Sequence, residues 1–82
     1  MKIQIALLEA LELLERGDWK SAHAIVQQDE SEFAAWLHGI VHVQEGDLGN
    51  ARYWYARARR AFSADANTEI TAARSVANGN VA

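Results

Sequence analysis

The chain has 82 residues, a formal net charge of −3 and 50% hydrophobic residues, with no proline and no cysteine. This half-apolar composition excludes a disordered tail. The absence of cysteine excludes a disulfide scaffold, a cysteine zinc finger, an iron–sulfur cluster and a thiol nucleophile. The length suits one small domain, and an alanine-rich chain without proline favours closely packed helices.

The hydrophobic periodicity predicts an all-α protein with five helices. We place these helices near residues 2–16, 18–28, 31–45, 48–62 and 68–77. They form one domain over residues 1–77, followed by a frayed tail over residues 78–82. The last helix has a weak pattern with Ile70, Ala73 and Val76 as its buried side, and we expect it to cover an open end of the fold.

The first predicted helix carries one apolar face. Its members are Ile3, Ala6, Leu7, Ala10, Leu11, Leu13 and Leu14. Ile5 and Leu8 fall among the acidic residues instead, which makes them candidates for a self-association contact that would give a homodimer. Glutamates interrupt the apolar run, so neither a signal peptide nor a membrane span is expected, and we predict a cytoplasmic protein.

A Gly-Asp pair occurs twice, as Gly17–Asp18 and as Gly46–Asp47, with a period of 29 residues. Glycine can end a helix in the left-handed conformation, and the aspartate that follows can cap the next helix. Each pair therefore indicates the turn of a helical hairpin. The repeat predicts two stacked antiparallel hairpins.

The third predicted helix carries the chain's clearest chemical pattern. Steps of four and three residues place His38, His42 and Glu45 on one helical face. Two histidines at this spacing can bind a divalent metal, with Glu45 as a third ligand and His23 of the neighbouring helix as a fourth. The alternatives are that the histidines hydrogen-bond within the helix packing, to Tyr55, a backbone carbonyl or Asp47, or that they face solvent.

The fourth predicted helix contains Tyr53, Trp54 and Tyr55 in succession, and these cannot all face one core. Trp54 and Tyr55 share the apolar face, which leaves Tyr53 pointing outward with Arg57 and Arg60. An aromatic ring with two guanidinium groups is typical of a partner-binding surface. The alternative is that the last helix buries Tyr53 while the arginines pair with acidic residues.

The charges are unevenly distributed along the chain. Residues 1–47 hold 3 Lys or Arg against 9 Asp or Glu, whereas residues 48–82 hold 5 against 2. The two halves can pair inside the fold, or the basic half can meet an anionic partner. The acidic balance and the lack of a recognised motif argue against nucleic acid. No phosphate loop, nucleophile elbow or Ser/His/Asp arrangement is present, so we predict no enzymatic activity.

Two resemblances accompany these patterns. The spacing of Gly39, Gly46, Ala51, Tyr55 and Ala58 resembles a tetratricopeptide repeat, although the period is 29 rather than 34 residues and no proline closes either unit. The stretches His-x3-His-x2-Glu-Gly-Asp and Asn-Ala-Arg-Tyr-Trp-Tyr also resemble those of a group of small bacterial helical-repeat proteins with no assigned activity. Both resemblances imply a helical-repeat fold and no particular ligand.

From the sequence we therefore expect a protein–protein interaction or assembly module. Its predicted surface consists of Tyr53, Arg57, Arg60 and Trp36. The second hypothesis is a small metal- or ligand-binding protein that uses the face formed by His38, His42 and Glu45, with His23.

Overall fold

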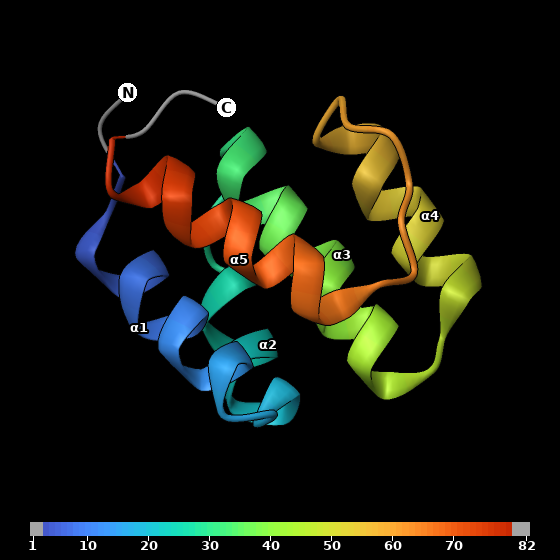
Figure 1. Ribbon diagram of the computed structural model, residues 1–82, viewed down its shortest axis with the longest axis horizontal. Helices are drawn as coiled ribbons and strands as arrows, with labels where there is room; N and C mark the ends of the chain where they lie inside the picture. The colour runs from blue at the N-terminus through green and yellow to red at the C-terminus, as the bar shows by residue number, and fades with distance from the viewer. Residues whose placement is uncertain (1–2, 80–82) are drawn as a thin grey trace.

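The computed structural model describes residues 3–79, and this part of the chain is built entirely of helices and connecting turns. The five helices are α1 (Ile5–Glu15), α2 (Trp19–Val26), α3 (Glu32–Glu45), α4 (Leu48–Arg57) and α5 (Ala66–Ala77) (Figure 1). The all-α prediction is confirmed. Among residues 3–79, no helix combines the length and the apolar character that crossing a membrane requires.

The repeated Gly-Asp pair forms the same local structure twice, as predicted. Gly17 and Gly46 have φ angles of 80° and 92°. The side chains of Asp18 and Asp47 then accept the backbone N–H groups of Ser21 and Asn50, each at 3.2 Å. Each pair thus ends one helix and caps the next, which fixes a short connection between α1 and α2 and between α3 and α4.

The prediction that the fourth helix continues to residue 62 is wrong, because α4 ends at Arg57. Arg59 adopts a φ angle of 60°, and the N–H group of Arg60 bonds back to the carbonyl of Tyr55 at 3.1 Å. This is the hydrogen bond of a left-handed helix end, formed here without glycine. The chain then turns back, so that the ring of Phe62 packs on that of Tyr55, with their centroids 5.5 Å apart.

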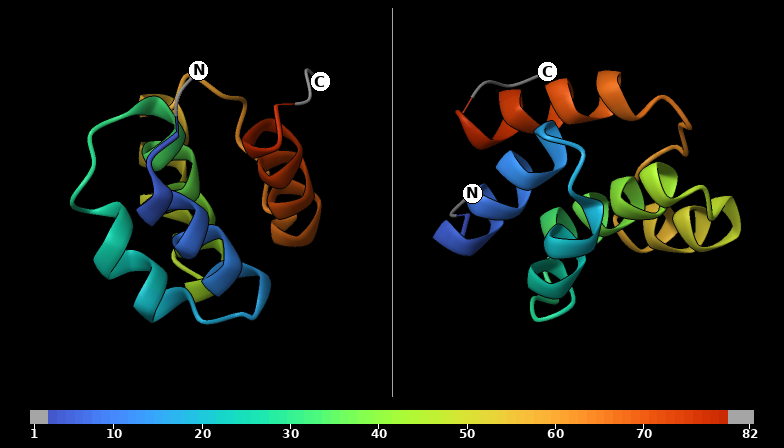
Figure 2. Two further views of the ribbon diagram at one scale, coloured as in Figure 1. Left: turned by 90° about the vertical axis from the view of Figure 1, so that its left-hand side faces the viewer. Right: turned by 90° about the horizontal axis from the view of Figure 1, so that it is seen from below.

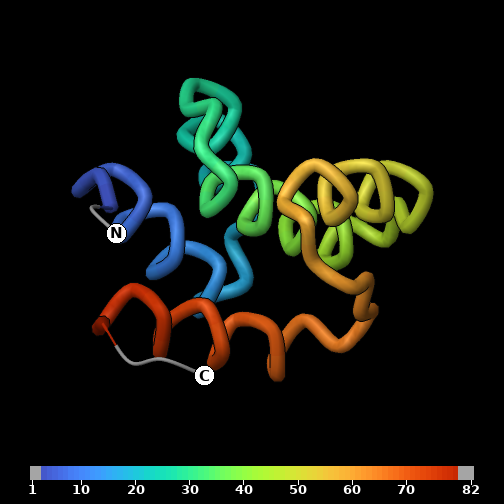
Figure 3. The backbone as a smooth tube through the Cα atoms, turned by 90° about the horizontal axis from the view of Figure 1, so that it is seen from above, coloured from blue at the N-terminus to red at the C-terminus, as the bar shows by residue number. Residues whose placement is uncertain are grey.

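Helix α3 is the centre of the fold, since every residue from Phe33 to His42 is buried. In Figure 2, α1 and α3 lie between α2 and α5, and Figure 3 shows α4 beside α3 at the end away from α1. Gly39 sets the close approach of α3 and α4, because a Cβ at this position would lie 2.5 Å from Cδ1 of Tyr55. The stacking of two hairpins in the manner of a tetratricopeptide repeat stays a prediction.

Helix α5 packs across α1 and α3 and is tied to both sides of the core. One carboxylate oxygen of Glu69 accepts the indole N–H of Trp36 at 3.1 Å and the hydroxyl of Tyr55 at 2.8 Å. Burial and this hydrogen bond raise the pKa of Tyr55. Arg74 of α5 forms a two-point pair with Glu15 at the end of α1, at 2.8 and 3.0 Å.

The acidic and basic halves of the chain do meet in the fold. Arg74 pairs with Glu15, and Arg59 pairs with Glu32 at 3.3 Å, so each of these ion pairs joins a basic residue after 47 to an acidic residue before it. Of the expected tail, residues 80–82 lie outside the described residues. Asn78 and Gly79 form the turn that ends α5.

Candidate metal centre

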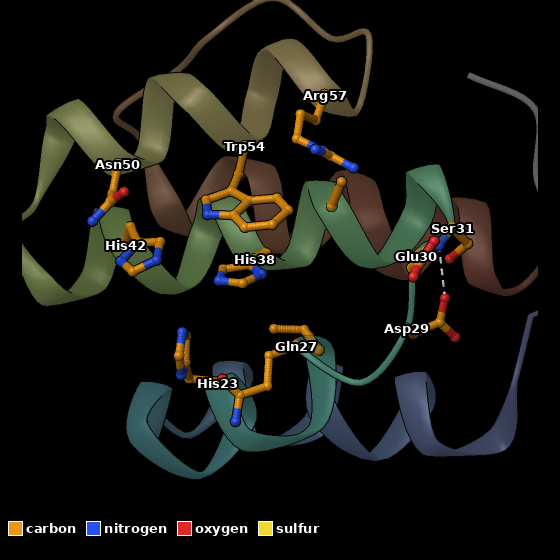
Figure 4. A pocket seen from close by; sticks show the side chains of 12 residues that line it. His23, Gln27, Asp29, Glu30, Ser31, His38, His42, Asn50, Trp54 and Arg57 are labelled. Carbon is orange, nitrogen blue, oxygen red and sulfur yellow. Dashed lines mark hydrogen bonds between the residues drawn. The ribbon is translucent and has the colours of Figure 1, made fainter.

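A groove of about 520 Å³ runs along α3 between α2 and α4. Its floor is α3, its two walls are α2 and α4, and the segment before α3 closes one end (Figure 4). We refer to it as the α2–α4 groove. Its lining residues are His23, Val26, Gln27, Asp29, Glu30, Ser31, Ala35, His38, His42, Asn50, Trp54 and Arg57.

All three histidines of the chain converge in this groove. His38 and His42 extend from α3, and His23 reaches them from α2. One ring nitrogen of each histidine lies within 4.8 Å of a ring nitrogen of each of the others. The helical spacing in the sequence showed only that His38 and His42 are neighbours on one helix. That His23 lies beside them is visible only in the structure.

The separation of the three rings matches that of a metal site. In a tetrahedral zinc site with Zn–N bonds of about 2.0–2.1 Å, the centroids of the ligating rings lie about 5 Å apart. The observed centroid distances are 4.8 Å for His23 and His38, 5.5 Å for His23 and His42, and 5.1 Å for His38 and His42. One nitrogen of each ring lies within 4.8 Å of the others, whereas the nitrogens of a tetrahedral zinc site are about 3.3 Å apart, so the rings must turn toward one another to share an ion.

Glu45 does not join the three histidines directly, in contrast to its predicted role as a third ligand. Its carboxylate lies 2.7 Å from Nδ1 of His42 and is half-exposed at the end of α3. In the tautomer whose Nδ1–H donates to this carboxylate, Nε2 of His42 carries the free lone pair that a metal requires. A carboxylate in this position fixes the orientation of a metal-binding histidine and increases its basicity.

His38 is held by a stacking contact on α4. Its ring lies parallel to the indole of Trp54, with a centroid distance of 3.8 Å and an interplanar angle of 9° (Figure 4). Burial, followed by the nearby His23 and His42, lowers the pKa of His38 to about 4. At neutral pH its imidazole is therefore uncharged, which is the form that binds a metal.

This depressed pKa predicts how the stability of the metal-free protein changes with pH. The unfolded chain takes up a proton at His38 near pH 6.5, whereas the folded chain does so only near pH 4. The free energy of unfolding should therefore decrease as the pH falls through this interval, by up to about 3 kcal/mol. Urea unfolding at several pH values in the presence of a chelator measures the slope.

The matched variant for this test is His38→Phe, which keeps an aromatic ring against Trp54 and removes the titrating group. Its free energy of unfolding should change less between pH 6.5 and 4 than that of the wild type. Equal pH dependence in the two proteins would show that His38 does not carry the effect.

The alternative to metal binding was that the histidines hydrogen-bond to Tyr55, a backbone carbonyl or Asp47. The structure shows other hydrogen bonds. The hydroxyl of Tyr55 bonds to Glu69, and His42 bonds to Glu45. Within residues 3–79, the side chains of His23 and His38 have no hydrogen-bond partner. Their ring nitrogens are therefore available to a ligand in the groove.

The structure divides the four residues of the predicted partner surface. Tyr53 is 52% exposed, and its hydroxyl accepts a hydrogen bond from Arg57 at 3.2 Å. Trp36 is only 2% exposed, so its assignment to a binding surface is wrong: α5 covers it and bonds to its indole. Arg60 lies beyond the end of α4 and stacks on Trp36, 3.5 Å from the ring centroid, instead of joining Tyr53.

The contribution of α4 to the groove was not predicted. Asn50, Trp54 and Arg57 line it together, and Trp54 had been assigned to the core face alone. The sequence contains a pattern that could have predicted it. These three residues are separated by steps of four and three, the same spacing that places His38, His42 and Glu45 on one helical face.

Comparison of the chain with protein-family models, with curated proteins and with solved structures gives no match.

Proposed function

We propose that the protein binds one divalent transition-metal ion through His23, His38 and His42. The observation that carries this proposal is the convergence of all three imidazoles at one end of an open groove, with ring separations suited to a shared ion. Imidazole nitrogen favours zinc, copper, nickel and cobalt over magnesium or calcium, which prefer oxygen ligands. The ion that we expect is zinc or a close chemical relative.

The surroundings of the three rings support the same proposal. His38 is uncharged at neutral pH and stacked on Trp54, and His42 is oriented by Glu45. The ligands come from two helices, so a bound ion would join α2 to α3 and stabilise the folded chain. Three protein ligands also leave a coordination position open toward the groove, as in sites where a metal binds water or a small molecule.

Calorimetric titration of the metal-free protein with zinc tests the proposal. We expect saturable binding of one ion per chain. Because a ligand at a hundred times its Kd adds about 2.7 kcal/mol of stability, the melting temperature should rise by about 10 °C or more. The variant in which all three histidines are replaced by alanine should lose both effects.

Two outcomes would overturn this function. One is the absence of saturable zinc, nickel or cobalt binding by the wild type. The other is unchanged binding by the triple variant, which would place the metal elsewhere on the chain. Gln27→Ala is the matched control, since Gln27 lines the groove but offers no imidazole, and its metal binding should equal that of the wild type.

A protein-interaction module stays the second candidate, supported by three exposed apolar side chains. Ile5 is 83% exposed, Tyr53 52% and Leu48 41%. The predicted binding surface is nevertheless reduced to Tyr53 and Arg57, since Trp36 is buried and Arg60 stacks on it. For this reason we place the metal site first.

A further inference from the structure

The α2–α4 groove extends well beyond the three histidines. They occupy one end, and the groove continues along α3 toward Ser31. Figure 4 places the guanidinium of Arg57 between Trp54 and Ser31, at the wall opposite α2. The volume of about 520 Å³ is far larger than an ion and one water molecule would fill. The shape of the groove thus points to an organic ligand beside the metal.

Arg57 is a positive charge without a carboxylate partner in the described part of the chain. The ion pairs formed by residues 3–79 involve Arg59, Arg74 and His42, and not Arg57. One of its N–H groups donates to the hydroxyl of Tyr53, and its guanidinium lies 5.4 Å from the ring centroid of Trp54. The remaining donors can bind a carboxylate through two parallel hydrogen bonds.

The metal end of the groove also requires negative charge. Imidazole binds a metal in its uncharged form, so three imidazole ligands would leave the two positive charges of a divalent ion uncompensated, and Glu45 reaches the metal only through His42. A carboxylate in the open coordination position would compensate one of these two positive charges. Two cationic points, the ion and Arg57, therefore face the same groove.

Part of the groove lining is suited to a short hydrocarbon chain. Val26 and Ala35 line the groove with methyl groups, whereas Asp29 and Glu30 lie at the Ser31 end. Asp29 already accepts the N–H group of Ser31 at 2.8 Å. The two acidic side chains would repel an anion that extended past Arg57, which limits the length of the ligand.

We propose, building on the metal-binding function, that the groove binds a small organic dicarboxylate. One carboxylate completes the coordination of the metal held by His23, His38 and His42, and the other pairs with Arg57. The groove continues from the histidines past Trp54 to Arg57, so the two carboxylates must be joined by a hydrocarbon spacer, and the affinities of dicarboxylates of different length report how long this spacer is.

Cobalt-loaded protein provides the test, because its visible spectrum changes when a ligand enters the metal's coordination shell. We would titrate it with acetate, malonate, glutarate and adipate. At least one of the three dicarboxylates should bind about tenfold or more tightly than acetate, because the second carboxylate binds intramolecularly.

Two arginine variants distinguish the contact of the ligand with Arg57 from its contact with the metal. Arg57→Gln should reduce the affinity for the tightest-binding dicarboxylate to that for acetate and leave cobalt binding unchanged. Arg59→Gln is the matched control, because Arg59 is exposed and lies outside the groove, and it should behave as the wild type. Circular dichroism of both variants verifies that their helices are intact.

The outcomes distinguish the two proposals. If the protein binds neither cobalt nor zinc nor nickel, the metal-binding function itself is wrong, and the dicarboxylate site is overturned with it. If cobalt binds but all four acids bind equally, or Arg57→Gln changes nothing, the metal site stands and the dicarboxylate site is wrong.

Discussion

Replacement of Gly39 by alanine is expected to lower the free energy of unfolding by about 2–3 kcal/mol. The added Cβ would lie 2.5 and 2.7 Å from Cδ1 and Cε1 of Tyr55, well inside contact distance, and 3.4 Å from the carbonyl oxygen of Ala51. Helices α3 and α4 must then separate, or the ring of Tyr55 must move. Either change disturbs the centre of the core.

The ring of Tyr55 has little freedom to move away. Its side chain is 1% exposed, its hydroxyl is bonded to Glu69, and Phe62 packs against it edge to face. Relief of the clash would therefore break the link between α4 and α5. This is why we expect an effect at the upper end of the range for overpacked cores.

Gly49→Ala is the matched control for this substitution. Gly49 also lies in a helix, but the nearest atom to its added Cβ is Oδ1 of Asp47 at 3.8 Å. Since alanine favours the helix by up to about 1 kcal/mol over glycine, this variant should be neutral or slightly stabilised. Urea unfolding followed by circular dichroism compares the two. Equal stabilities would contradict the close approach at Gly39.

The second large effect concerns the metal. His42→Ala should weaken zinc binding about 100-fold or more, because it removes one of the three imidazole ligands. Glu45→Gln should weaken it by a smaller factor, about tenfold, because the histidine remains but loses the carboxylate that orients it at 2.7 Å. Competition with a coloured chelator measures both affinities.

Which of the two variants loses more zinc affinity tests whether Glu45 orients His42 or binds the metal itself. A larger loss in Glu45→Gln than in His42→Ala would mean that the carboxylate binds the ion itself. Glu32→Gln serves as control, since Glu32 lies on the same helix, outside the groove, and pairs with Arg59. Its zinc affinity should equal that of the wild type.

Local sequence signals predicted the turns of this fold well. Each Gly-Asp pair affects only the helix end before it and the first turn of the helix after it. The positive φ angle of the glycine and the cap made by the aspartate therefore follow from residue type alone. The end of α4 was not predictable in this way. Arg59 takes a conformation that glycine usually provides, and the contact of Phe62 with Tyr55 that accompanies it is tertiary.

The same distinction applies to the candidate site. The spacing of His38 and His42 on one helix predicted that they are neighbours, because it depends on helical geometry only. The approach of His23 and the stacking of Trp54 depend on how three helices pack. The prediction that Trp36 belongs to an exposed binding surface was wrong for a related reason. Its burial depends on α5, and the weak apolar pattern of this helix does not predict where it packs on α3.

X-ray absorption spectroscopy of the zinc-loaded protein tests the metal site most directly. The arrangement of His23, His38 and His42 predicts three imidazole nitrogens at about 2.0–2.1 Å, with an oxygen ligand in the remaining position. The His42→Ala protein, examined at the same zinc content, should show one imidazole fewer. A zinc ion surrounded mainly by carboxylate oxygen, or a spectrum that His42→Ala leaves unchanged, would contradict a metal centre built from these three histidines.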